Sequence, residues 1–439
     1  MRRALLPALL WILGILPMAV YGRSAGPPVG HTGAPVDGGQ NCTMCHRTFP
    51  VNSGAGRITI STTPYTPGVK QNITVTVEDP DARRWGFQLT ARLHSDESKQ
   101  AGTFTVTDSV RVKCLPDDRD APCNGDREFA SHTSASTRPG TPGPAVWTVE
   151  WTPPATDVGE VIFYMAGNAA NNNNTNTGDH IYTNVAIVRP VCSLTAKPTI
   201  SGISDGASYR TSISPNALIS IFGSGFAPPN NLYRAISSDL VSGKLPTQFG
   251  CIAVEIDGQR SPVFFVGQNQ INAQAPIINR SGEMGVRVIL NPGTSGEVAT
   301  DEAKVQWNFY SPALFQIDAT SVLIIDATQS NSIVTSTAPA KPGDIVVLYG
   351  TGFGYSNPVW QPGEFSNGLS PVRDPYVVMV GGAELPAANI LYAGLSSAAP
   401  GLYQFNLKLP DGLADGDAPL SIRIGGYQTQ AGLVIPVKR

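Results

Sequence analysis

Ile73-Thr74-Val75-Thr76-Val77 alternates β-branched apolar residues with threonine at every position. Because successive side chains of a β-strand point to opposite faces, this period of two predicts a strand with one buried face. Similar alternation or continuous apolar character recurs at 87–91, 146–151, 161–165 and 181–188. Seven or so strands over ~130 residues, separated by turn residues, predict one β-sandwich across residues 57–190.

An internal repeat follows a linker at 191–198. Its paired segments are 219–226 with 346–353, 254–258 with 378–382, and 271–276 with 405–410. Spacings that drift while the apolar pattern persists indicate conserved strands joined by variable loops. We therefore expect an all-β chain, with the N-terminal β-sandwich followed by two tandem Ig-like units at 199–313 and 314–439.

The composition excludes several classes of protein. The 439 residues include 30 Lys+Arg and 33 Asp+Glu, only 14% charged in total, with 45 Gly and 37 Pro. This near-neutral balance gives no electrostatic footprint for nucleic acid. No H-E-x-x-H or Walker sequence occurs, and every histidine lies at or before residue 180. We therefore expect a protein that is not an enzyme.

Residues 1–22 have the organisation of an export signal. Two arginines after Met1 precede an apolar stretch from Ala4 to Val20, and cleavage is expected near Gly22. An uncleaved anchor is the alternative, but Pro7 and Pro17 interrupt the stretch. The expected product is secreted, periplasmic or attached to the cell surface, without a transmembrane span, in a compartment where disulfides persist.

Cys42-Thr43-Met44-Cys45-His46 is a C-x-x-C-H sequence, the attachment signature of c-type haem. It lies in a Gly/Pro-rich segment, 23–56, that we expect to be a flexible lead. The thiols of Cys42 and Cys45 would each add to one vinyl group of a single covalent haem, and His46 would bind the iron. The alternatives are a Cys42–Cys45 disulfide, a thioredoxin-like redox pair, and half of a zinc site.

The sixth iron ligand is not fixed by the motif. His180, at the end of an Asn-rich loop, is the first candidate, and Met165, in an apolar strand, is the weaker one because core packing also explains it. His31 is a further candidate, whereas His94 and His132 lie in stretches that we expect to be solvated. A methionine ligand would raise the reduction potential and a second histidine would lower it.

The other cysteines have the character of structural residues. Cys114 and Cys123 bracket a short acidic loop and are expected to form a disulfide, worth roughly 2–3 kcal/mol by loop closure. Cys192 in the linker and Cys251 in the first repeat either pair with each other or remain buried thiols, and an oxidising compartment favours pairing.

The first domain contains six characteristic stretches within about residues 40–190: 41–46 (NCTMCH), 65–68 (YTPG), 86–91 (GFQLTA), 151–154 (WTPP), 163–171 (FYMAGNAAN) and 178–183 (GDHIYT). Through them it resembles the Reeler-like domain of bacterial exported proteins, in the group labelled choice-of-anchor V. The resemblance implies a β-sandwich with a C-x-x-C-H near its start and says little about activity.

The second half resembles a C-terminal domain found on exported proteins of soil Acidobacteria, through 205–209 (DGASY), 214–226 and 268–276 (QNQINAQAP). This chain departs from that family at Cys251, where a small glycine is usual. Chains of the first family often end in a membrane or wall anchor, so the resemblance implies that the repeats take the place of that anchor and attach the protein to the surface.

Two functional hypotheses follow. In the first, a single-haem protein transfers electrons or has a redox or binding role at the cell surface, with a redox partner protein or a surface component as its partner and the Ig-like tail as attachment module. In the second, a structural or adhesive exoprotein has a Cys42–Cys45 disulfide and no haem. A peroxidase-like haem enzyme is a third option that only His180 supports.

Overall fold

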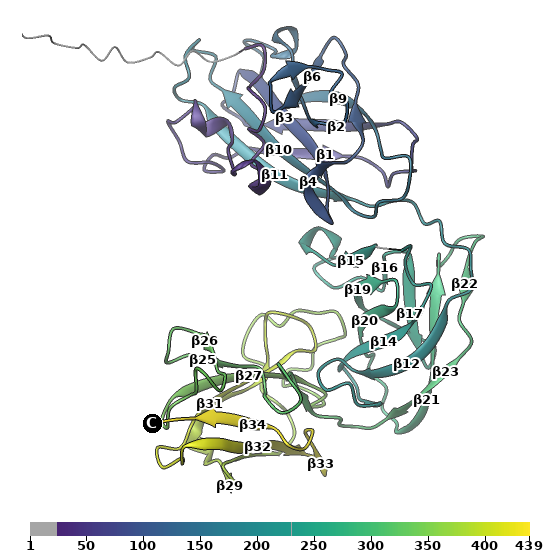
Figure 1. Cartoon of the computed structure of the whole chain (residues 1–439), viewed down its shortest axis with the longest axis vertical. Coiled ribbons are helices and arrows are strands. Elements are labelled where there is room, and N and C mark those ends of the chain that lie inside the picture. The colour runs from purple at the N-terminus through teal and green to yellow at the C-terminus, as the bar shows by residue number, and fades with distance from the viewer. Residues whose placement is uncertain (1–23, 230) are drawn as a thin grey trace, which may run out of the picture. The chain divides into compact units, whose positions relative to one another are not determined.

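The computed structural model describes residues 24–229 and 231–439, which form two compact units, one ending at Val191 and one beginning at Cys192 (Figure 1). The predicted signal peptide lies outside the described residues. The described chain is all-β, as the sequence predicts. Its only helical elements are five 3-10 turns: η1 Pro35–Asp37, η2 Cys42–Met44, η3 Ser134–Ser136, η4 Ser237–Asp239 and η5 Ala387–Asn389.

Two antiparallel sheets build the first unit. The first sheet has the order β1 Arg57–Ser61, β2 Gln71–Glu78, β9 Ala145–Thr152 and β5 Thr103–Phe104. The second has the order β11 His180–Val188, β10 Val161–Ala170, β3 Arg84–Leu93, β8 Arg127–His132, β6 Val110–Leu115 and β7 Arg119–Asp120, with β4 Asp96–Gln100 paired to β3.

The core of this unit lies between the two sheets. Strand β9 alternates strictly, so that Trp147, Val149 and Trp151 are buried while their neighbours face outward. These side chains share one hydrophobic cluster with Phe87 of β3 and Phe163 of β10, from the other sheet. The alternating apolar pattern therefore produces the β-sandwich that the sequence predicts.

The segment expected to be a flexible lead packs instead on the outer face of the second sheet. Ala34 is fully buried against Ile162 and Tyr164 of β10. Asp37 lies 2.9 Å from the guanidinium of Arg92 of β3, and both side chains are almost inaccessible to solvent. Because the lead covers this face, β10 is buried on both sides, which explains its continuous apolar sequence.

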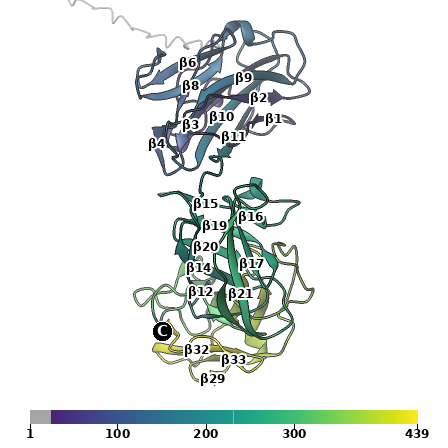
Figure 2. The ribbon, with the colours of Figure 1, turned by 90° about the vertical axis from the view of Figure 1, so that its right-hand side faces the viewer.

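The second unit contains two sandwiches in sequence. In the first, one sheet has the order β12 Thr199–Asp205, β14 Leu218–Ser224, β20 Gln270–Gln274, β19 Val263–Gly267 and β15 Leu232–Arg234 (Figure 2). Its other sheet has the order β13 Ser212–Ile213, β23 Ala303–Trp307, β21 Gly282–Leu290, β17 Ile252–Ile256 and β16 Gln248–Phe249, with β18 Gln259–Ser261 on β17 and β22 Val298–Ala299 on β21.

The second sandwich repeats this arrangement. One sheet has the order β26 Ser332–Ile333, β25 Ile324–Asp326, β27 Ile345–Thr351, β31 Tyr403–Lys408 and β30 Ile390–Leu395, with β24 Ala313–Leu314 on β27. The other has the order β29 Ala383–Glu384, β28 Tyr376–Val380, β32 Gly416–Ile424 and β33 Tyr427–Gln428, with β34 Val434–Val437 on β32. The run β12-β14-β20-β19 thus corresponds to β25-β27-β31-β30, as the internal repeat predicts.

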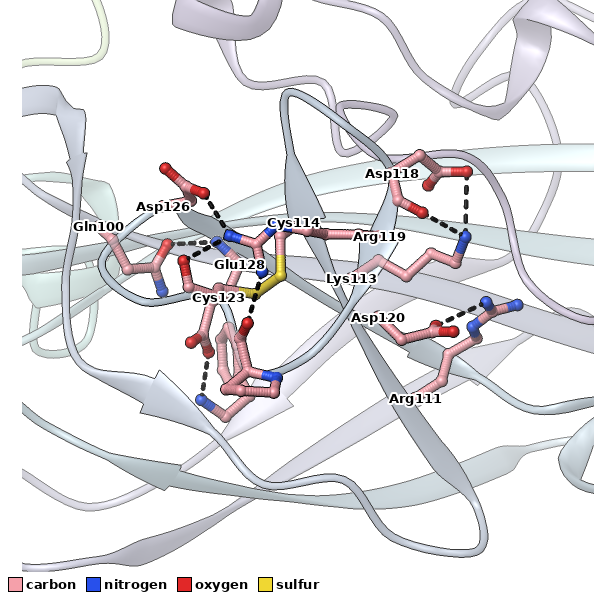
Figure 3. The surroundings of a disulfide bond; sticks show 12 residues. Gln100, Arg111, Lys113, Cys114, Asp118, Arg119, Asp120, Cys123, Asp126 and Glu128 are labelled. Atoms are coloured by element: carbon pink, nitrogen blue, oxygen red, sulfur yellow. Dashed lines mark hydrogen bonds and ion pairs between the residues drawn. A yellow bond between two sulfur atoms is a disulfide. The ribbon is translucent and has the colours of Figure 1, made fainter.

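The predicted Cys114–Cys123 disulfide is present, and of the two alternatives for Cys192 and Cys251 the structure has the paired one. Cys114–Cys123 closes the β6–β7 hairpin, where the Lys113–Asp118 and Arg119–Asp126 ion pairs flank it (Figure 3). Cys192–Cys251 ties the start of the second unit to its first sandwich. Among the described residues, no helix has the length and apolar character needed to cross a membrane.

Candidate functional site

The C-x-x-C-H sequence forms a single tight turn. The Asn41 side chain accepts a hydrogen bond from the backbone of Thr43 at 2.9 Å and so begins the 3-10 turn η2. The backbone N–H groups of Cys45 and His46 both donate to the carbonyl oxygen of Cys42, at 3.2 and 3.0 Å. This turn brings the two thiols and the imidazole to the wall of one cavity.

The cavity has a volume of about 520 Å³, within the range of small-molecule and cofactor sites. Its walls come from the lead, the motif, the start of β3, the end of β8 and the end of β10 with the Asn-rich loop. The side chains that matter below are His31, Cys42, Cys45, His46, Arg84, Trp85, Phe87, His132, Asn168 and Asp179.

Asp179 orients the motif histidine. Nδ1 of His46 lies 2.6 Å from a carboxylate oxygen of Asp179, which is 1% exposed and also accepts the backbone N–H of Asn171. Because the carboxylate accepts, Nδ1 carries the proton and the lone pair of Nε2 is available to a ligand. A carboxylate behind a histidine is the usual support of a metal-binding imidazole. The amide Nδ2 of Asn168 donates a long hydrogen bond, 3.3 Å, to this Nε2, and a ligand at Nε2 would displace it.

Cys42 and Cys45 are free thiols, both half-buried. Loss of solvent and the neighbouring Cys45 raise the pKa of the Cys42 thiol to about 12. Cys42 is therefore neutral at physiological pH, whereas thioredoxin-like cysteines depend on a lowered pKa. This environment does not support the thioredoxin-like alternative.

The donor set fits a covalently attached haem. Two unbonded thiols and an imidazole with an available Nε2 share one cavity, and the buried Oδ1 of Asn168 beside them has no hydrogen-bond partner in the described part of the chain. Within residues 24–229 and 231–439, no three His, Cys, Asp or Glu side chains gather as a set for a bare metal ion.

The two named candidates for the sixth ligand lie away from the cavity wall. Met165 is fully buried in the sandwich core, where it packs with aromatic and aliphatic side chains. The His180 ring is 4.4 Å from that of Phe49, and its Nδ1 is 3.2 Å from Asp79. His94 pairs with Glu160 at 2.7 Å.

The histidines that do line the cavity are His31 and His132. The expectation that His132 is solvated is wrong, because its side chain is 7% exposed and Nδ1 contacts the backbone of Phe87. Burial lowers the pKa of His132 to about 4.

Several cavity residues escaped the sequence argument. Asp179 directly precedes His180, but nothing in the sequence shows that its carboxylate turns to His46 across 133 positions. Gly86 offered a signal, since a glycine inside a strand often marks a close approach. A Cβ at Gly86 would come within 2.6 Å of the His132 ring.

Comparison with known proteins identifies part of the chain. Residues 40–171 match the family model described as the Reeler domain, a shorter range than the 40–190 expected, although the sandwich continues through β11. No curated protein matches.

Among solved structures, the human F-spondin reeler domain is 18% identical, with a TM-score of 0.22, and covers 32% of this chain and 91% of its own. The Reelin-N domain of F-spondin is also 18% identical, with 34% and 96% coverage and a TM-score of 0.22. A cohesin of scaffoldin B from Acetivibrio cellulolyticus is 11% identical, with 30% and 98% coverage and a TM-score of 0.19.

Proposed function

We propose that the protein is an exported, cell-surface or periplasmic carrier of one c-type haem, with a role in single-electron transfer or redox-linked binding. The observation that carries the proposal is the common cavity of Cys42, Cys45 and His46, backed by the His46–Asp179 hydrogen bond. The Reeler match and the two disulfides agree with a protein of an oxidising compartment.

Each residue of the site would have a distinct role in holding the haem. The S–H of Cys42 and of Cys45 would each add across one vinyl C=C, with a new C–S bond and the hydrogen placed on the neighbouring carbon, so no oxidant would be consumed. Nε2 of His46 would bind the iron, and Arg84 would supply a cation for a propionate. When bound, the haem supplies reversible one-electron exchange between ferric and ferrous iron.

The partner would be a redox protein or a surface component. The tandem sandwiches, whose relation to the Acidobacteria C-terminal domain and to Ig-like folds belongs to this proposal, would hold the haem domain at its place of action. Their many exposed loops provide the surface for such contacts.

A structural or adhesive exoprotein without cofactor is the second candidate. The match to a Reeler domain, the sandwich architecture and the two disulfides favour it as much as they favour the first. In this version Cys42 and Cys45 become oxidised to each other outside the cytoplasm, and the loops bind a carbohydrate or a protein.

Expression of the full chain in a host with a c-type haem maturation system separates the two candidates. The denatured protein is tested for haem by peroxidase staining and by intact mass. We expect one haem per chain that survives denaturation and is lost in Cys42→Ala/Cys45→Ala. The matched control, Cys114→Ala/Cys123→Ala, removes the other cysteine pair of the same unit and should keep the haem.

A colourless wild-type protein with a Cys42–Cys45 disulfide in its peptide map would overturn the haem proposal and leave the adhesive candidate. Haem that washes out on denaturation would show binding without thioether attachment and would contradict the role given to the two cysteines.

A further inference from the structure

We propose that His31 would supply the second imidazole to the iron of a haem bound in this cavity, in addition to that of His46. This inference rests on the proposed function and specifies its cavity further. His31 lines the cavity with the motif residues, yet it precedes them in the lead and belongs to no recognised sequence signature.

The lead folds His31 back beside the motif. An antiparallel bridge joins Thr32 to Asn41, and the backbone N–H of Gly33 donates to the carbonyl of Gln40 at 2.7 Å. Continued antiparallel pairing would oppose positions 31 and 42, and both His31 and Cys42 line the cavity. One short hairpin therefore presents a thiol on one arm and an imidazole on the other.

Gln88 of β3 fixes the position of this arm. Its side chain is 1% exposed, accepts the backbone N–H of His31 at 2.7 Å and donates to the carbonyl of Pro28 at 2.8 Å. Because both ends of the Gln88 amide hold the lead, the backbone of His31 is set before any cofactor arrives. Such preorganisation is what a ligand site requires.

The tautomer of His31 leaves the lone pair of its Nε2 available to a ligand. Nδ1 lies 2.9 Å from the carbonyl oxygen of Val29. A carbonyl only accepts, so Nδ1 carries the proton and Nε2 keeps its lone pair. This is the same arrangement as at His46, where Asp179 takes the place of the carbonyl. A backbone carbonyl is a common partner for the second nitrogen of a metal-bound imidazole.

His132, the other histidine of the cavity, has no single partner that fixes its tautomer. Its Nδ1 lies 3.0 Å from the backbone N–H and 3.1 Å from the carbonyl oxygen of Phe87. Its ring is buried and packs tightly against Gly86, where a Cβ would come within 2.6 Å of it, whereas Nδ1 of His31 meets one carbonyl oxygen. His180, His94 and Met165 do not line the cavity.

The test compares the haem-loaded wild type with His31→Ala, His31→Met and His180→Ala. We expect the wild type to be low-spin in both oxidation states. His31→Ala should keep its covalent haem but become high-spin, with a ferric charge-transfer band, and added imidazole should restore the low-spin spectrum. His31→Met should have a higher midpoint potential than the wild type. His180→Ala should match the wild type.

The outcomes separate this inference from the proposed function. A wild type without covalent haem would overturn both. Covalent haem with an unchanged low-spin spectrum in His31→Ala would overturn only the assignment of His31, and a high-spin His180→Ala would transfer the role to His180. Thermal unfolding of the Cys42→Ala/Cys45→Ala protein, with and without His31→Ala, shows whether His31 also supports the fold.

Discussion

At the residue scale, the ion pair between Asp37 and Arg92 holds the lead on the sheet. Burial lowers the pKa of Arg92, and the adjacent Asp37 carboxylate offsets this. Asp37→Ala removes the carboxylate from the buried Arg92, which keeps only its hydrogen bond to Gln100, and from Arg127, so we expect a loss of about 3–5 kcal/mol in the free energy of unfolding. Urea denaturation measures it.

The control for this prediction is Glu78→Ala, which breaks the exposed pair with Arg57 and should cost at most about 1 kcal/mol. An equally small loss for Asp37→Ala would mean that the lead is loosely held, as its Gly/Pro-rich sequence suggests. The Gly/Pro-rich composition of the lead predicts a flexible segment. Composition alone does not reveal that Asp37 pairs with the buried Arg92, 55 positions away.

His132 makes the stability of the first unit depend on pH. Its pKa is about 4 in the folded chain and near 6.5 when unfolded, so the unfolded chain binds more protons between these values. Stability is full above about pH 6.5 and falls by up to about 3 kcal/mol as pH drops towards 4. His132→Gln should flatten this slope in urea titrations at several pH values.

His94 provides the contrast. The hydrogen bond to Glu160 raises the pKa of His94 in the folded chain. The protonated His94 therefore stabilises the fold fully at a pH below its pKa in the unfolded chain, and this stabilisation is lost as the pH rises through its pKa in the folded chain. His94→Gln should therefore lose more stability at pH 5 than at pH 8. The same dependence in both variants would contradict the environments assigned to the two rings.

At the element scale, the two disulfides differ in the length of chain they close. Cys192–Cys251 joins residues 59 positions apart, and Cys114–Cys123 joins residues 9 positions apart. Loop-closure arithmetic assigns about 4 kcal/mol to Cys192–Cys251 and about 3 kcal/mol to Cys114–Cys123. We expect Cys192→Ala/Cys251→Ala to lower only the unfolding transition of the second unit, and Cys114→Ala/Cys123→Ala only that of the first, in calorimetry.

The sequence predicts elements well where one physical rule dominates. Period-two alternation located β2 and β9, each of which has one core-facing side, and the repeated motif located β14 and β27. The sequence did not reveal features that depend on tertiary contacts. Asp205 and Asp326 occupy equivalent buried positions at the ends of β12 and β25 and accept backbone N–H groups of the loops that follow, although the sequences around them differ.

In the candidate site, too, local patterns were readable from the sequence and tertiary contacts were not. A covalent signature must be contiguous, so Cys42, Cys45 and His46 are readable directly. A distal ligand and a supporting carboxylate need only meet in space. Asp179 therefore required the structure, and so did the choice of His31 among the candidate ligands, while Met165, attractive as a ligand type, is explained by core packing.

At the scale of the whole molecule, the described residues form two units, each with hydrophobic clusters of its own. Within the second unit the two sandwiches share buried hydrogen bonds: Thr351 Oγ1 accepts the Leu218 N–H at 2.8 Å, and Gln274 Oε1 accepts that of Gly363 at 2.6 Å. The sequence predicts three domains, but we expect the chain to unfold as two cooperative units, because the two sandwiches of the second unit should unfold together.

This expectation is tested by cutting the chain in two places. Residues 24–191 and 192–439, produced separately, should each unfold in one transition close to that seen in the full chain, because no core cluster is divided. A fragment 192–309 should be markedly less stable than 192–439, since the cut exposes the N–H of Leu218 and the amide of Gln274 that the second sandwich satisfies. Urea denaturation of the three fragments measures this. If 192–309 were as stable as 192–439 within experimental error, the two sandwiches would fold independently. Their shared hydrogen bonds would then follow from proximity and would not be a source of cooperativity.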